Sequence, residues 1–82
     1  MIELIEWEDP VVTMGSIGTM VKMLRSERGM SQEELGLEAG LSQYAVFALE
    51  HGRNTHFSSV LMVLDALDRE LVIRRKKDVS HI

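Results

Sequence analysis

The segment LSQYAVFALEHGR, residues 41–53, concentrates the side chains of this chain that could carry out chemistry. Ser42 supplies a hydroxyl and His51 an imidazole, but no nucleophile, base and orienting group occur together as nucleophilic catalysis requires. A serine directly before an apolar stretch is better explained as the cap of a helix. We therefore expect no catalytic residue and no enzymatic activity.

Metal and cofactor chemistry is equally unsupported. The chain has no cysteine, and His51, His56 and His81 are spaced too widely for a helical metal-binding pair. None of the six methionines stands in a pattern that indicates metal or redox work. We expect no metal, no disulfide, no cofactor and no small-molecule substrate.

Length and composition set further limits. The 82 residues make one small domain, which buries so little surface that a partner subunit would add considerably to its stability. No apolar run approaches the roughly 20 residues of a membrane span, and the N-terminus MIELIEWEDP is acidic where a signal peptide would be basic. These features predict a cytoplasmic protein with no membrane partner.

The net charge of −4 argues mildly against nucleic acid as a partner, because Lys and Arg supply most non-specific affinity. The distribution of the charge is more informative than its sum. The first ten residues contain four acidic side chains, whereas residues 74–77 read RRKK. The two ends of the chain are therefore complementary in charge.

Hydrophobic spacing predicts a first helix that begins at a Ser16 cap and ends at Gly29. Its buried face recurs at the three- and four-residue intervals of a helix, through Ile17, Met20, Val21 and Leu24. A second, short helix follows, with Ser31 and Glu34 in the S-x-x-E capping box and Gly40 as its end.

Only Leu41 separates Gly40 from the next cap, Ser42. Two short helices joined so tightly cannot lie antiparallel, so they must cross steeply as in a helix-turn-helix. In the third helix, an advance of about 100° per residue defines an inner and an outer side. The inner side carries Ala45, Val46 and Leu49, and the outer side carries Gln43, Tyr44, Phe47, Ala48 and His51.

Gly52 ends the third helix, residues 53–56 form a loop, and a fourth, more fully buried helix follows. Its apolar residues are Val60, Leu61, Val63, Leu64 and Leu67. Two short β-strands are also predicted, one at the edge formed by IELIEW in residues 2–7 and one in ELVIRRKK after Asp68.

From Ile17 to Arg75 the chain resembles the Cro and lambda-repressor-like helix-turn-helix family, also called the XRE family, and most of all its HipB-like antitoxin branch. The matching text is IGTMVKMLRSERGMSQEELGLEAGLSQ, the LE of ALEHGR, and a fourth helix that runs into LDRELVIRR. The resemblance implies a mainly α fold, a lambda-repressor-like bundle of four to five helices. Short N- and C-terminal β-strands would pair at a dimer interface.

The resemblance also implies double-stranded DNA as a partner, with residues 32–39 across the backbone and residues 43–51 in the major groove. Gln43 would contact a base, since its amide can form bidentate hydrogen bonds with adenine. Gln32 would contact a phosphate, and Arg25 with Glu50 would tie the first helix to the third. The predicted DNA contacts are Gln32, Ser42, Gln43, Tyr44, Phe47, Ala48, His51, Arg53 and Asn54.

The third helix departs from the family at three positions. Where relatives carry Thr, Ser and Arg, this chain has Ala45, Phe47 and Ala48. Fewer side chains can therefore read bases through hydrogen bonds. Tyr44, Phe47 and Ala48 could instead contact thymine methyl groups. Sequence preference should then lean on DNA shape.

The HipB-like branch uses a C-terminal strand at its dimer interface. We expect the same here of Leu71, Val72 and Ile73, which would pair either with the same strand of a second copy or with the strand of Ile2 and Leu4 in the same or the partner chain. We favour a pairing that involves both ends. Acidic and basic strands placed side by side gain cross-strand charge pairs of roughly 0.2 to 1 kcal/mol each. The expected divisions are an N-terminal strand or arm (1–12), a DNA-binding domain (13–68), and a C-terminal strand with a basic tail (69–82).

The predicted function is that of a homodimeric transcriptional regulator from bacteria or phage, a repressor of the antitoxin kind that reads palindromic DNA. A HipA-like kinase would then be a toxin partner. Two alternatives remain. One is a protein-interaction module that docks a toxin or a polymerase subunit through the aromatic face. The other is a restriction-modification controller, in which a helix typically replaces the terminal strand.

Overall fold

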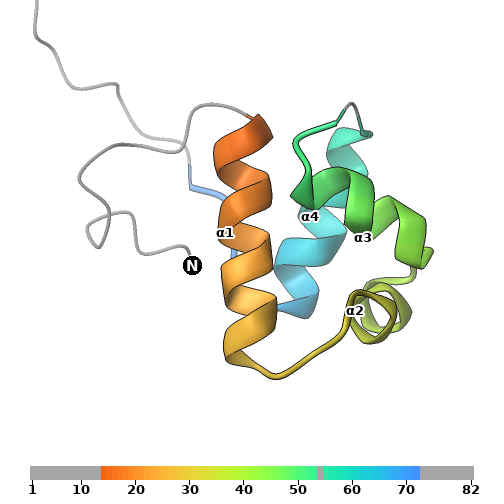
Figure 1. Cartoon of the computed structure of the whole chain (residues 1–82). Helices are drawn as coiled ribbons and strands as arrows, with labels where there is room; N and C mark the ends of the chain where they lie inside the picture. The colour runs from red at the N-terminus through yellow and green to blue at the C-terminus, as the bar shows by residue number, and fades with distance from the viewer. Residues whose placement is uncertain (1–13, 54, 73–82) are drawn as a thin grey trace, which may run out of the picture.

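Four helices make up the part of the chain that the computed structural model describes, residues 14–53 and 55–72. They are α1 (Met14–Glu27), α2 (Gln32–Ala39), α3 (Gln43–Glu50) and α4 (Phe57–Ala66), as Figure 1 shows. None of these helices is both long and apolar enough to cross a membrane. The helical fold expected from the sequence is confirmed.

The predicted caps of α2 and α3 are present. Both hydrogen bonds of the capping box join Ser31 and Glu34, and Gly40 ends α2 in the left-handed conformation at φ 77°. The Ser42 hydroxyl accepts a hydrogen bond from the backbone N–H of Ala45 at 3.1 Å. These contacts satisfy N–H groups that have no partner inside a helix, so each start is fixed by its own sequence.

The predicted start of α1 is wrong. The helix begins at Met14, and Ser16 lies inside it rather than at its cap. The reason is tertiary, because Met14 packs against the core together with Ile17. Met14, Ile17 and Val21 share one helical face, so core packing extends the helix beyond the serine.

The turn between α2 and α3 depends on close backbone contact. A Cβ on Gly36 would lie 2.7 Å from the carbonyl oxygen of Leu41, and the Leu41 N–H donates to the Gly36 carbonyl at 2.8 Å. Figure 1 shows α2 nearly end-on while α3 runs across the view. The steep crossing predicted from Gly40 and Ser42 is therefore present, and it also requires a residue without a side chain at position 36.

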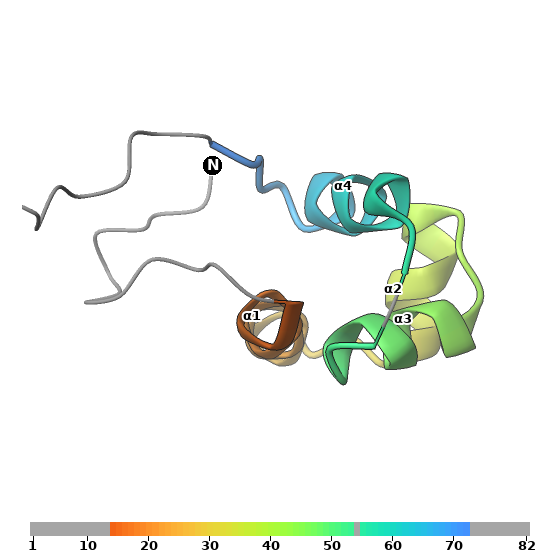
Figure 2. The same ribbon diagram turned by 90° about the horizontal axis from the view of Figure 1, so that it is seen from above.

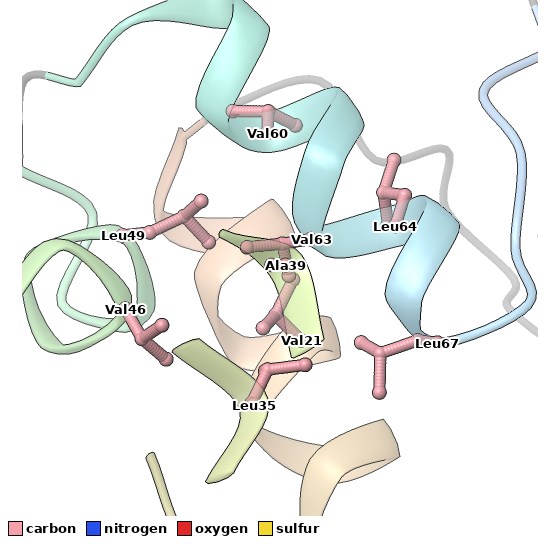
Figure 3. Packing of buried hydrophobic residues seen from close by; sticks show 9 residues of the cluster. All are labelled: Val21, Leu35, Ala39, Val46, Leu49, Val60, Val63, Leu64 and Leu67. Atoms are coloured by element: carbon pink, nitrogen blue, oxygen red, sulfur yellow. The ribbon is translucent and has the colours of Figure 1, made fainter. Parts of the chain in front are cut away.

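The core lies where all four helices meet, and the side chains in Figure 3 converge there. They are Val21, Leu35, Ala39, Val46, Leu49, Val60, Val63, Leu64 and Leu67. Leu61 was expected among them but is 42% exposed. It sits one residue beyond Val60, and only one face of α4 meets the core, so the apolar run on α4 exceeds what the core can cover.

The predicted strands fall largely outside the described residues. Ile2 and Leu4 at the N-terminus and Ile73 at the C-terminus lie there. Leu71 and Val72 are described, are exposed, and form no strand in this chain alone. In Figure 2 the short blue segment that contains them leaves the end of α4 and runs away from α2 and α3. Both strands stay predictions.

Candidate nucleic-acid interface

Helix α3 is held by its neighbours on one side and is open on the other. It packs against α1, α2 and α4. At Gly18 the backbone of α1 approaches so closely that a Cβ would lie 2.4 Å from the Leu49 carbonyl oxygen and 2.6 Å from that of Glu50. Beyond the helix, Gly52 adopts φ 68° and turns the chain away. Close backbone contact therefore fixes the C-terminal end of α3, and the contact of Gly36 with Leu41 fixes the turn at its N-terminal end.

The open side of α3 carries four of the nine predicted contact residues. Gln43 and His51 are exposed, Tyr44 is 65% exposed, and Phe47 is half-buried. These four positions span about 100° of the helix circumference when each residue advances about 100°. A narrow exposed stripe on an otherwise buried helix can enter a groove while its scaffold stays outside.

Ala48 does not belong to this stripe. It is 7% exposed and therefore buried, which corrects its predicted place on the outward face. Because α3 contacts three other helices, its buried arc runs from Ala48 through Leu49 and Val46 to Glu50. A two-sided division of the helix placed Ala48 on the outer side, and only the packing of the neighbouring helices shows that it is buried.

The exposed stripe forms an aromatic cluster, defined by Tyr44, Phe47, His51 and Arg53. Ring centroids of Tyr44 and Phe47 are 6.0 Å apart, and those of Phe47 and His51 are 4.1 Å apart. The Arg53 guanidinium carbon lies 5.4 Å from the centroid of Phe47, within reach of a cation–π interaction. Phe47 is the centre of this cluster. Sequence reasoning found its members but not their mutual contacts.

Beneath the stripe, an ion pair joins α1 to α3. Arg25 donates from Nε to Glu50 at 2.6 Å and from Nη2 to the other carboxylate oxygen at 3.1 Å. Its Nη1 also donates to the Met30 carbonyl at 2.8 Å. The hydrogen bond with Glu50 raises the pKa of Arg25, against the lowering effect of burial. The structure thus brings together the two residues that the family pattern pairs.

Gln32 takes part in the same network. Its Nε2 donates to Oε1 of Glu50 at 3.1 Å, so α2 is tied to α3 through the carboxylate that Arg25 also holds. Gln32 is half-buried at the first position of α2. This contact was missed from the sequence, because nothing in the spacing of residues 32 and 50 indicates that their side chains meet.

Other basic side chains lie apart from the stripe or at its end. Arg53 is exposed just beyond α3, and Asn54 lies outside the described residues. Lys22 is exposed on α1. Arg28 donates to Asp68 at 2.8 Å and to the Ala66 carbonyl at 3.3 Å, which directs it toward the end of α4.

Comparison with known proteins agrees with this geometry. A helix-turn-helix family model matches residues 21–73. The restriction-modification controller protein C.AhdI from Aeromonas hydrophila is 34% identical, covers 70% of this chain and 88% of its own, and has a TM-score of 0.64. A comparison with curated protein sequences finds no match.

Two solved structures that contain HipB match more of this chain than C.AhdI does, although their sequence identity to it is lower. HipB in complex with an O4 20mer has a TM-score of 0.77 at 20% identity, over 84% of this chain and 99% of the other. The HipA–HipB–O2–O3 complex gives the same values. At this identity the likeness concerns the fold alone.

The fold and the exposed third helix define the class of DNA-binding transcriptional regulators. Within that class, the chain belongs to the helix-turn-helix family, in its XRE type.

Proposed function

We propose that this protein regulates transcription by placing α3 in the major groove of double-stranded DNA. One observation carries the proposal: α3 is buried against three helices along one side and exposed along the stripe from Gln43 to His51. The family match and the likeness to controller and HipB structures support it. The orientation of α3, with its stripe exposed, is fixed by the two helix caps and by the turn that contains Gly36 and Gly40.

Each exposed group has a contact that suits its chemistry. Gln43, in the first turn of α3, can exchange two hydrogen bonds with adenine. Ser42 already accepts a hydrogen bond from Ala45, so its hydroxyl proton is available to a phosphate oxygen. Arg53 and the phenol of Tyr44 can also reach the backbone. Gln32 has one amide proton left beside its bond to Glu50, at the positive end of α2.

We infer that the protein acts as a homodimer. Phe57 and Leu61 are large apolar residues exposed on one face of α4, and Leu71 and Val72 are exposed in the segment that follows. Covering them with a second copy would remove apolar surface from water. The two copies of α3 would then read half-sites about one helical turn apart, in a palindrome. The strands predicted around Ile2, Leu4 and Ile73 would add to this interface.

The antitoxin and controller assignments are supported by different relatives. HipB structures share more of the chain, and one of them contains HipA. C.AhdI is more similar in sequence. We propose autorepression of the antitoxin kind, with a HipA-like kinase as partner, and retain the controller as the alternative. Co-expression with the protein encoded next to its gene separates them, since only the antitoxin would copurify with a kinase-like partner.

Fluorescence anisotropy with labelled duplex DNA from the promoter of its own gene tests DNA binding directly. We expect saturable binding that weakens steeply with salt, because Lys and Arg displace counterions from phosphates. Gln43→Ala should cost about 1 to 3 kcal/mol of binding free energy on the preferred duplex. Arg53→Ala should reduce the salt slope by about one unit. Met23→Ala, at an exposed apolar position on α1, is the matched control.

Absence of any complex at low salt would refute the proposal.

A second candidate function is favoured by the aromatic cluster, which could dock a protein instead. Phe47→Ser separates the two. Loss of DNA binding with partner binding kept supports readout of DNA, whereas loss of a protein partner with DNA binding kept supports docking.

A further inference from the structure

Phe47 is the most constrained member of the exposed stripe. Its ring lies 4.1 Å from that of His51 and 6.0 Å from that of Tyr44, and the Arg53 guanidinium is 5.4 Å from its centroid. A half-buried ring with neighbours of this kind has few rotamers available. It therefore presents a fixed apolar surface on the exposed side of α3.

His51 is held in a way that keeps this arrangement. Its Nδ1 lies 2.9 Å from the carbonyl oxygen of Phe47. Because a carbonyl oxygen can only accept, the imidazole must carry its proton on Nδ1 for this hydrogen bond to form. The bond turns the imidazole back over the preceding turn of α3, where it meets the Phe47 ring. The His51 side chain is thus fixed against the ring by one polar and one aromatic contact.

A phenyl ring can read only one kind of group in the major groove. It has neither donor nor acceptor, so it cannot distinguish bases by hydrogen bonds. The C5 methyl of thymine is the apolar group that the major groove displays, and contact with it is a recognised form of readout. A ring kept in one orientation discriminates better than a mobile one, since less conformational entropy is lost on contact.

We infer that Phe47 is a specificity-determining residue that reads a thymine methyl group, and that His51 is the positioning residue for its ring. The inference rests on the proposed function and names the chemistry by which α3 selects its half-site. Arg53, beside the same ring, places the neighbouring phosphate relative to the methyl group. Gln43 reads a base edge in the first turn, so the half-site combines one polar and one apolar contact.

The test begins with a pool of random 20-base-pair duplexes, from which the wild-type protein enriches a preferred duplex. Each thymine of that duplex is then replaced by uracil, which removes the methyl and leaves all hydrogen-bonding groups. At the position that Phe47 contacts, we expect wild-type affinity to fall about fourfold, the value of one buried methyl-sized group. Phe47→Ala should bind the thymine and uracil duplexes equally.

Phe47→Leu is the second variant, because it keeps an apolar side chain and should retain part of the discrimination even if Phe47→Ala folds poorly. Met23→Ala is again the control and should keep the full thymine-to-uracil ratio. For His51, we expect His51→Ala to lower that ratio while the salt dependence of binding stays unchanged. His51→Phe, which restores a ring over Phe47, should recover it. A purely structural residue would not move the ratio.

The outcomes separate this inference from the proposed function. If no duplex is enriched, the proposed function fails and the inference fails with it. If a duplex is enriched but no uracil substitution weakens binding, α3 reads DNA without a methyl contact and the inference alone is overturned. A uracil effect that persists unchanged in Phe47→Ala also overturns it, since another residue must then contact the methyl.

Discussion

At the scale of single residues, Glu50 is the group on which the placement of α3 depends most directly. Its side chain is 1% exposed, and that of Arg25 is 13% exposed. The carboxylate accepts from Arg25 and from Gln32, so its buried charge is both paired and hydrogen-bonded. Among the described residues, no buried side-chain nitrogen or oxygen lacks a hydrogen-bond partner. Every polar group of the network therefore has a partner, and removal of any member should lower the stability of the fold.

Arg25→Ala should destabilise the protein by about 3 kcal/mol, because it leaves the Glu50 carboxylate buried without its counter-charge. Urea denaturation measures the change. Arg28→Ala is the matched control, since its ion pair with Asp68 is largely exposed and should contribute less than about 1 kcal/mol. Equal losses in the two variants would contradict the central role of the buried pair.

The double variant Arg25→Met with Glu50→Leu removes both charges. Its stability should recover to near that of the wild type, since apolar groups of similar volume can replace a buried pair. DNA affinity should not recover fully, because the hydrogen bond from Gln32 that orients α2 against α3 is also lost.

At the scale of elements, the crossing of α1 and α3 depends on Gly18. A glycine inside a helix ordinarily costs about 1 kcal/mol relative to alanine. Here the added Cβ would lie 2.4 Å and 2.6 Å from two backbone carbonyl oxygens of α3. Backbone atoms cannot rotate out of the way as a side chain can, so the steric term exceeds the gain in helix propensity.

Gly18→Ala should therefore destabilise by about 1 to 3 kcal/mol and weaken DNA binding by moving α3 outward. Thermal unfolding and anisotropy would measure the two effects. Ser26→Ala, at an exposed position of α1, is the control and should be neutral or slightly stabilising. A Gly18→Ala variant more stable than the wild type would show that the two helices do not approach so closely.

The cap of α2 should make the stability of the protein depend on pH. The backbone N–H of Ser31, and then its hydroxyl, hold the pKa of Glu34 below its ordinary value of 4.5. Since the folded pKa is the lower one, the ionised carboxylate contributes stability above the unfolded pKa, and that contribution is lost as pH falls through the folded pKa. In urea denaturation, the wild type should lose more stability on acidification below about pH 4.5 than Glu34→Gln. Parallel pH profiles would rule out a role for the ionised cap.

At the scale of the whole molecule, an apolar surface remains that one copy cannot cover. The described part of the chain exposes Phe57 and Leu61 on α4 and Leu71 and Val72 after it. A small domain buries little surface, so its stability has little margin for large apolar side chains that stay exposed to water. The proposed dimer resolves this, and it would also set the spacing of the two α3 helices.

Leu61→Asn should weaken the proposed dimer at least tenfold, since it places an amide in an apolar interface. Sedimentation equilibrium measures the dissociation constant. Leu37→Asn changes an equally apolar but more exposed residue on α2 and should leave the assembly unchanged. Should the wild type sediment as a monomer at micromolar concentration, α4 must have a different partner.

Much of the fold could be predicted because its signals are local. The capping box of Ser31 with Glu34, the Ser42 cap and the left-handed Gly40 each depend on residues within one turn. The core residues of α1 and most of those of α4 follow from helical spacing. Such features need no knowledge of the partner element, and the helix-turn-helix class follows from them.

The features that sequence alone misjudged all depend on which elements meet. Met14 joins the core and starts α1 early, Ala48 is buried by three neighbouring helices, and Leu61 is left exposed because α4 has one covered face. The hydrogen bond from Gln32 to Glu50 and the contacts around Phe47 join side chains on different turns or helices. Local pattern determined where the helices are and that α3 has an outer side. Only tertiary packing decided which residues that side contains, because burial is a property of neighbours that are distant in sequence.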